Sequence, residues 1–186
     1  MSLFRVFVAM VAIAAFGGCA SPRPEAQAPQ AIVNAPYRLA SGDRLRIIVF
    51  GQDNLSNSYS VDGAGVISMP LIGRVRAQGL TAAELEREIE ARLRQGYLRE
   101  PSVSVEVEAF RPFFILGEVN TAGQYPFING MTIQEAVAVA GGFTPRAVES
   151  GADVTRVVDG RPVTFAAPLS YPLRPGDTIN VEERFF

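Results

Sequence analysis

The sequence has no histidine, no tryptophan and a single cysteine among its 186 residues. Histidine is the usual general base and a common zinc ligand, so its absence excludes Ser-His-Asp and Cys-His catalytic arrangements within this chain. One cysteine forms neither an internal disulfide nor a CxxC metal site. We therefore expect no catalytic residues, no bound metal and no cofactor.

An excess of positive charge is also missing. The chain has 17 basic and 19 acidic side chains and a formal net charge of −2, whereas proteins that bind nucleic acid usually show a clear basic excess. Hydrophobic residues make up 48% of the chain, enough for a packed core, and 17 glycines and 13 prolines indicate many turns. The length suits one domain or two small ones.

The N-terminus reads as a targeting signal. Arg5 precedes the apolar run Val6–Phe16, which is shorter than the roughly 20 apolar residues of a membrane-spanning helix. It matches the hydrophobic region of a secretory signal peptide. We predict a signal peptide over residues 1–18.

Phe16-Gly17-Gly18-Cys19 resembles a bacterial lipobox, in which the cysteine is lipidated and becomes the new N-terminus. The alternative is an ordinary signal peptide in which Cys19 has no role. We expect a lipidated Cys19, because acyl chains would hold the protein on a membrane. No aspartate follows Cys19, which by resemblance to enterobacterial sorting implies the outer membrane. Residues 19–35 are rich in proline and glutamine, which predicts a flexible tether.

Residues 36–110 predict a first small α+β unit of short strands and one helix. Thr81 and Glu84 form a capping box, Leu85, Ile89 and Leu93 recur at helical spacing, and Gly96 ends the helix. Alternating or apolar segments predict strands at Arg44–Phe50, Tyr59–Val61, Val66–Met69 and Pro101–Ala109.

The helix has four glutamates within seven residues, Glu84, Glu86, Glu88 and Glu90, which could suggest catalytic carboxylates. They alternate with arginines, however, and we expect a solvated helix face with ion pairs Glu88–Arg92 and Glu90–Arg94.

Residues 111–186 predict a second α+β unit. Thr132 and Glu135 form another capping box before a short helix whose buried side is Ile133, Ala136, Val137 and Ala140, and Gly141-Gly142 stops it. Strands are predicted at Phe113–Val119, Gln124–Phe127, Asp153–Val158, Pro162–Phe165 and Thr178–Val181.

One segment is repeated across the two units. Tyr37-x-Leu39-x-x-Gly42-Asp43-x-Leu-x-Ile matches Tyr171-x-Leu173-x-x-Gly176-Asp177-x-Ile-x-Val position for position. Glycine permits the turn and aspartate can accept hydrogen bonds from backbone N–H groups there, so the repeat predicts the same turn before two strands.

Several short motifs occur together: Gly-Asp-x-Leu-x-Ile-x-Val from Gly42, Asp-Gly-x-Gly-x-Ile-x-x-Pro from Asp62, Pro-x-Val-x-Val from Pro101, Gly-Glu-Val-x-x-x-Gly-x-Tyr from Gly117 and Ala-Gly-Gly-Phe from Ala140. Jointly, over residues 36–186, they resemble the polysaccharide biosynthesis/export family of Gram-negative outer-membrane lipoproteins. The resemblance implies an α+β fold, with a polysaccharide export domain over 36–110 and an SLBB-type β-grasp domain over 111–186.

The resemblance also implies a function. The protein would form a homo-oligomeric ring, anchored by lipid to the outer membrane and facing the periplasm, that helps to export a capsular polysaccharide or exopolysaccharide. It would work with an inner-membrane polysaccharide co-polymerase, often linked to a tyrosine kinase, and would not be an enzyme. No amphipathic helix follows Val181 in this sequence, so a separate pore protein is expected in the outer membrane. Phe185 and Phe186 would pack on the domain's own sheet or dock a partner.

Two other functions stay open. The β-grasp domain could hold a saccharide and anchor it without transport. An enzyme with a carboxylate pair would use Asp43, Asp62 or Asp177 first, yet all three lie in turn motifs with a structural explanation. No glycan-binding residue is assigned; Arg74 and Arg76 could face an anionic glycan, but a solvated strand edge explains them better.

Overall fold

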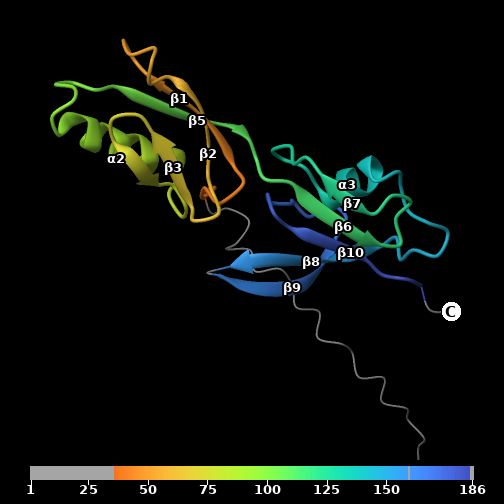
Figure 1. Ribbon diagram of the computed structural model, residues 1–186. Coiled ribbons are helices and arrows are strands. Elements are labelled where there is room, and N and C mark those ends of the chain that lie inside the picture. The colour runs from red at the N-terminus through yellow and green to blue at the C-terminus, as the bar shows by residue number, and fades with distance from the viewer. Residues whose placement is uncertain (1–35, 159, 185–186) are drawn as a thin grey trace, which may run out of the picture.

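A computed structural model describes residues 36–158 and 160–184 (Figure 1). The predicted signal peptide, the tether with Cys19, and Phe185 and Phe186 lie outside these residues. The described chain has an α+β fold with two separate hydrophobic clusters, one built from residues before Phe110 and one from residues after it. The predicted fold class is confirmed.

The first cluster lies among two small sheets and a helix. The larger sheet has the antiparallel order β2-β1-β5, and a separate hairpin pairs β3 with β4. The elements are β1 (Arg44–Val49), β2 (Asn57–Ser60), β3 (Val66–Met69), β4 (Gly73–Arg76), α2 (Ala82–Arg94) and β5 (Val103–Ala109). Strand β2 begins and ends earlier than predicted. Strand β4 was not predicted, because Val75 is its one buried side chain and leaves no alternating pattern.

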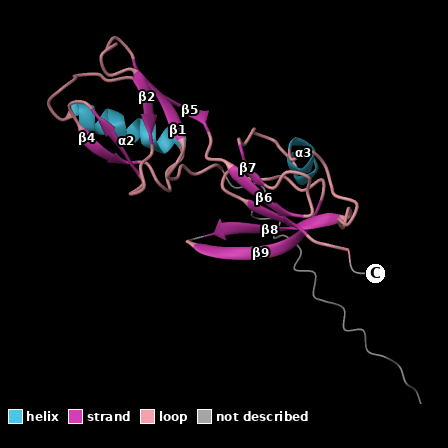
Figure 2. Cartoon of the chain, turned by 45° about the vertical axis from the view of Figure 1, so that its right-hand side comes forward, coloured by secondary structure: helices cyan, strands magenta, loops and turns pink. Residues whose placement is uncertain are grey.

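Helix α2 follows the predicted pattern. Its first turn is closed by the capping box between Thr81 and Glu84, and Leu85, Ile89 and Leu93 are fully buried against the strands. Because these three side chains lie on one stripe, the helix can bury a single face while its charged side chains stay in water. Helix α2 packs against β5 and β4, and Figure 2 shows it beside β4.

Two glutamates of α2 have a role that was not predicted. Strand β5 is an edge strand, and the carboxylates of Glu86 and Glu90 accept hydrogen bonds from the N–H groups of Val105 and Val103, at 2.9 and 3.1 Å. Among the described residues the predicted Glu88–Arg92 ion pair is present and the Glu90–Arg94 pair is not. Thus the helix protects a sheet edge that would otherwise present free donors.

The second cluster lies between a five-stranded sheet and one short helix. The strand order is β7-β6-β10-β8-β9, in which β10 is parallel to β6 and antiparallel to β8. The elements are β6 (Phe113–Gly117), β7 (Gly123–Tyr125), α3 (Ile133–Val139), β8 (Gly151–Val158), β9 (Arg161–Pro168) and β10 (Thr178–Val181). A hairpin followed by a helix and a central parallel strand is the β-grasp arrangement that the resemblance implied.

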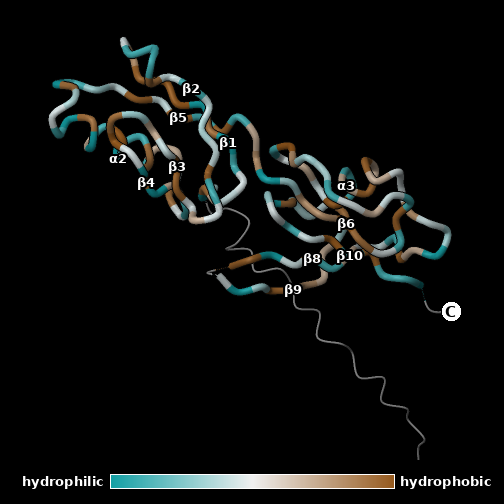
Figure 3. Tube along the Cα trace, viewed as in Figure 1, coloured by the Kyte–Doolittle hydropathy of each residue, from teal (hydrophilic) through white to brown (hydrophobic). Residues whose placement is uncertain are grey.

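Helix α3 covers one face of this sheet. It starts at the predicted capping box of Thr132 and Glu135, and it buries Ile133, Ala136 and Val137 against strand residues of the same cluster. Figure 3 shows hydrophobic stretches along the strands. In β8 and β10 buried residues alternate with more exposed ones, as expected for a sheet with one covered face.

Neither helix of the described residues is long and apolar enough to cross a membrane.

Candidate functional site

The repeated Gly-Asp segment forms the same turn twice. Gly42 and Gly176 both have a positive φ, +93° and +83°, which glycine adopts without strain. The backbone N–H three residues before each aspartate, from Ala40 and from Arg174, donates to the aspartate's Oδ2 at 2.8 Å. The predicted turn chemistry is therefore confirmed in both copies.

In the second copy the aspartate is buried against an arginine. Arg156 donates from Nε and Nη2 to the two oxygens of Asp177, at 2.9 and 2.7 Å, and the two side chains are only 5% and 1% exposed. The Arg156 guanidinium also lies near the rings of Phe165 and Tyr171. Burial alone would lower the pKa of Arg156, but the hydrogen bonds and charge of Asp177 outweigh it and raise the pKa.

In the first copy the aspartate is bound mainly by neutral donors. Asp43 accepts from the Tyr37 hydroxyl at 2.6 Å and from the Arg111 backbone N–H at 3.0 Å, while the Arg111 guanidinium stays 3.9 Å away. Burial, followed by the hydrogen bond to Asp43 and its negative charge, raises the pKa of the Tyr37 hydroxyl well above its usual value.

Arg111 lies between the two copies. A Cβ atom on Gly176 would come within 2.4 Å of the Arg111 Nε, and one on Gly42 within 3.4 Å of the Arg111 Cβ. Beside it, the ring of Phe110 packs edge-on against Tyr37 of the first half and Phe127 of the second. The two halves therefore meet at residues 110 and 111.

The three aspartates considered for an enzyme are all structural partners in turns. Asp62 Oδ1 accepts from the N–H groups of Ala64 and Val66, at 2.9 and 3.1 Å, so it stabilises the turn before β3. The exposed Arg74 lies 3.8 Å from Asp62, in agreement with a solvated strand edge. Within residues 36–158 and 160–184 no acidic cluster is suited to a metal ion.

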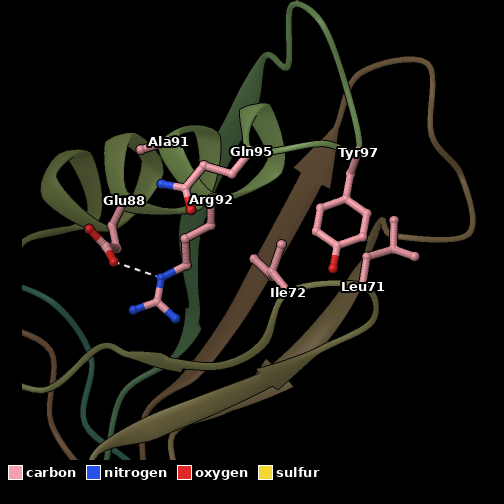
Figure 4. Close-up of a pocket in the computed structure, with 7 residues that line it drawn as sticks. All are labelled: Leu71, Ile72, Glu88, Ala91, Arg92, Gln95 and Tyr97. Carbon is pink, nitrogen blue, oxygen red and sulfur yellow. Dashed lines mark hydrogen bonds and ion pairs between the residues drawn. The ribbon is translucent and has the colours of Figure 1, made fainter.

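The first half also has an open groove. It lies between the C-terminal half of α2 and the turn that joins β3 to β4, with a volume of about 480 Å³. Its lining residues are Leu71, Ile72, Glu88, Ala91, Arg92, Gln95 and Tyr97. Figure 4 shows Tyr97 and Leu71 on one side, the side chains of α2 on the other, and Ile72 between them.

One wall of the groove is a strained turn. The Ile72 N–H donates to the Pro70 carbonyl at 2.9 Å and Leu71 has a φ of +69°, which together define a three-residue γ-turn. Leu71 is the one non-glycine residue with positive φ in the described chain, and its side chain is 53% exposed. Such a backbone costs about 1–3 kcal/mol, and strain of this kind tends to occur at functional sites.

The other wall is helix α2, and the turn at the end of this helix positions Tyr97 on the side of Leu71. Arg92 donates to Glu88 at 2.7 Å and to the Arg74 carbonyl at 2.8 Å, so its guanidinium has a fixed position. Gly96, with a φ of +106°, ends the helix, and the N–H groups of Tyr97 and Leu98 both donate to the Leu93 carbonyl. This turn places the ring of Tyr97 beside the groove.

Comparison with known proteins gives the family. The family model described as polysaccharide biosynthesis/export protein matches residues 31–108, and the SLBB domain model matches residues 112–166. The chain belongs to the polysaccharide biosynthesis/export family. The predicted resemblance is confirmed, and family membership supports the expectation of a non-enzymatic protein.

Three relatives have names that refer to the production, export or transport of polysaccharides. The chain is 34% identical to the exopolysaccharide production protein ExoF of Rhizobium meliloti (strain 1021), over 58% of this chain and 28% of ExoF. It is 30% identical to the EPS I polysaccharide export outer membrane protein EpsA of Ralstonia solanacearum, over 88% of this chain and 52% of EpsA. It is 24% identical to the polysialic acid transport protein KpsD of Escherichia coli, over 67% of this chain and 22% of KpsD. The match therefore spans about a quarter to a half of the length of each of these relatives.

Sequence reasoning identified the aspartates of the turns but neither their arginine partners nor the groove. In this family member, Tyr37 and Tyr171 were visible as members of the repeat, and they are the residues whose hydroxyls lie next to Asp43 and Arg156. Nothing in the local pattern marked Arg111 or Arg156, because each reaches its aspartate from a distant segment. Leu71 and Tyr97 had no signal either.

We predict that Arg156→Ala lowers the free energy of unfolding by about 3–5 kcal/mol, because it removes the buried cation that donates to both carboxylate oxygens of Asp177. Arg111→Ala is the matched control: Asp43 keeps three neutral donors, and the loss should be about 1 kcal/mol. Urea unfolding followed by circular dichroism measures both. Equal losses in the two variants would contradict this asymmetry.

A second prediction concerns the γ-turn. Leu71→Gly should raise the free energy of unfolding by about 1 kcal/mol, because glycine adopts the positive φ without strain. Leu71→Ala keeps the strain and removes a half-exposed side chain, so it should stay within about 0.5 kcal/mol of the unmodified protein. Thermal unfolding of the two variants side by side is the measurement, and an identical effect of both would show that the turn is unstrained.

Proposed function

We propose that this protein takes part in the export of a capsular polysaccharide or exopolysaccharide across the outer membrane and is not an enzyme. The observation that carries the proposal is the tandem match of an export-family model and an SLBB model along one chain. The relative EpsA, whose name places it in polysaccharide export at the outer membrane, aligns with 88% of the chain.

We propose that a lipid on Cys19 anchors the protein to the outer membrane, facing the periplasm, after removal of residues 1–18. Support comes from the lipobox-like segment that ends in the single cysteine. The chain would divide into a tether over 19–35, an export domain over 36–110 and an SLBB-like domain over 111–186. The two separate hydrophobic clusters, which meet at Phe110 and Arg111, support that division.

We further propose that copies of the chain assemble as a ring. Helix α3 covers one face of the five-stranded sheet, while Phe114, Leu116 and Val157 are exposed on the other face. Large apolar side chains exposed on an open sheet face favour contact with another protein surface. The ring would receive its polymer from an inner-membrane co-polymerase of the kind often linked to a tyrosine kinase, and a separate outer-membrane pore protein would complete the path.

The export function is tested by deleting the gene and measuring polysaccharide at the cell surface and in the periplasm. We expect surface polysaccharide to fall, a gene for the unmodified protein to restore it, and a Cys19→Ser gene to fail to restore it, because acyl chains provide the membrane affinity. Immunoblots for equal amounts of the two proteins are the control.

Unchanged surface polysaccharide in a deletion strain without a second homologous gene would overturn the export proposal. The alternative is then a saccharide-binding module that anchors a glycan in the cell envelope without transporting it.

The ring proposal predicts that Leu116→Asp lowers the oligomer size of the full chain purified in detergent, because it places a charge in an apolar contact. Ile128→Asp is the matched control, since Ile128 is also exposed but lies in the loop before α3. Sedimentation velocity compares the two. Oligomers of the same size in both variants would exclude this sheet face from the ring contact.

A further inference from the structure

We propose that the groove between α2 and the β3–β4 turn binds a sugar ring of the polysaccharide that the protein helps to export. This inference rests on the proposed export function, and it adds a binding site in the first half of the chain. The argument uses the shape of the groove, its two kinds of wall and its charge.

The first wall offers an apolar surface of the kind that sugars contact. Tyr97 and Leu71 are 51% and 53% exposed, and Figure 4 shows the aromatic ring next to the leucine side chain. One face of a pyranose ring carries mainly C–H groups, and it can pack on the face of an aromatic ring, while the phenol hydroxyl keeps a polar contact. Two exposed apolar side chains at one edge thus match the apolar face of a sugar.

The second wall offers polar groups that project from one side of a helix. Glu88, Arg92 and Gln95 lie four and three residues apart, so they project from the same side of α2. Their carboxylate, guanidinium and amide groups are planar and present pairs of hydrogen-bonding atoms, which suits neighbouring hydroxyl groups on a ring. A volume of about 480 Å³ lies within the range of small-molecule sites, roughly 300–1,000 Å³.

The walls are positioned before any sugar arrives. Arg92 is held by Glu88 and by the Arg74 carbonyl, Tyr97 by the turn at Gly96, and Leu71 by the γ-turn. Groups that are already ordered lose less conformational entropy when they bind, which raises affinity without further contacts. A binding role would explain why the groove edge has a strained leucine although the strain lowers stability.

The charge of the groove selects the class of ligand. Glu88 and Arg92 are its two charged residues and they form an ion pair, so the lining carries no net charge. Recognition should therefore depend on hydroxyl groups and ring packing, and salt should weaken it little. This distinguishes the groove from the exposed arginines Arg74 and Arg76 of β4, to which an acidic polymer would bind in a salt-dependent way.

The test uses the full chain purified in detergent and, as the probe, short oligosaccharides made by partial acid hydrolysis of the native strain's surface polysaccharide. Isothermal titration calorimetry at about 0.05 M and about 0.5 M sodium chloride should give the same saturable binding. Tyr97→Ala and Gln95→Ala should each weaken it, Tyr97→Ala by at least about tenfold. Tyr97→Phe, which keeps the ring, should stay within about threefold, and Gln134→Ala, an exposed glutamine on α3, should have no effect.

Three results would overturn the groove proposal: affinity unchanged in both Tyr97→Ala and Gln95→Ala, binding lost at the higher salt concentration, or variants that alter oligomer size and leave oligosaccharide affinity intact. Circular dichroism spectra of each variant confirm folding before titration. The groove proposal and the export proposal can be rejected separately. Titration of the variants tests the groove, and surface polysaccharide in the deletion strain tests export. Intact export with no binding at the groove rejects only the groove, whereas binding without an export defect supports the anchoring alternative.

Discussion

Each half of this protein depends on a buried carboxylate whose charge must be compensated by hydrogen-bond donors or a cation. Asp43 and Asp177 are 0% and 1% exposed, and an ion out of water is tolerated only when hydrogen bonds or an opposite charge compensate its lost hydration. Each aspartate directly precedes the central strand of its sheet, β1 in the first and β10 in the second. The donors that surround the two carboxylates therefore also determine where the central strands begin.

The two copies satisfy the same constraint in different ways, and the difference links the halves. Asp177 has a cation from its own half, Arg156 on the neighbouring strand β8. Asp43 depends on the backbone N–H of Arg111, whose side chain lies against the turn at Gly176. One residue thus contacts both turns, so the first turn is completed by the segment that leads into the second half.

Much of the architecture follows from local patterns in the sequence. Thr81 and Thr132 cap their helices as expected, the buried stripes of α2 and α3 match their spacing, and the repeated turn has the predicted hydrogen bonds. The missed and wrong predictions also have physical reasons. Strand β4 buries one side chain and has no periodic signal, and Glu90 bonds to the edge of β5 in preference to Arg94, because an unpaired backbone donor there would be costly. Cys19 and the lipid anchor remain predictions from the sequence.

The sequence by itself determined the helices and strands of the described residues except β4, the two turns and the family, because helix caps, alternation and glycine turns act over a few residues and leave a local signature. Only the tertiary structure decided which arginine meets which aspartate, since Arg111 and Asp43 are 68 positions apart and Arg156 and Asp177 are 21 apart. The groove depends on tertiary packing in the same way. Its two walls come from a hairpin turn and a helix end that have no common sequence pattern, and they become one surface when α2 packs beside the β3–β4 hairpin.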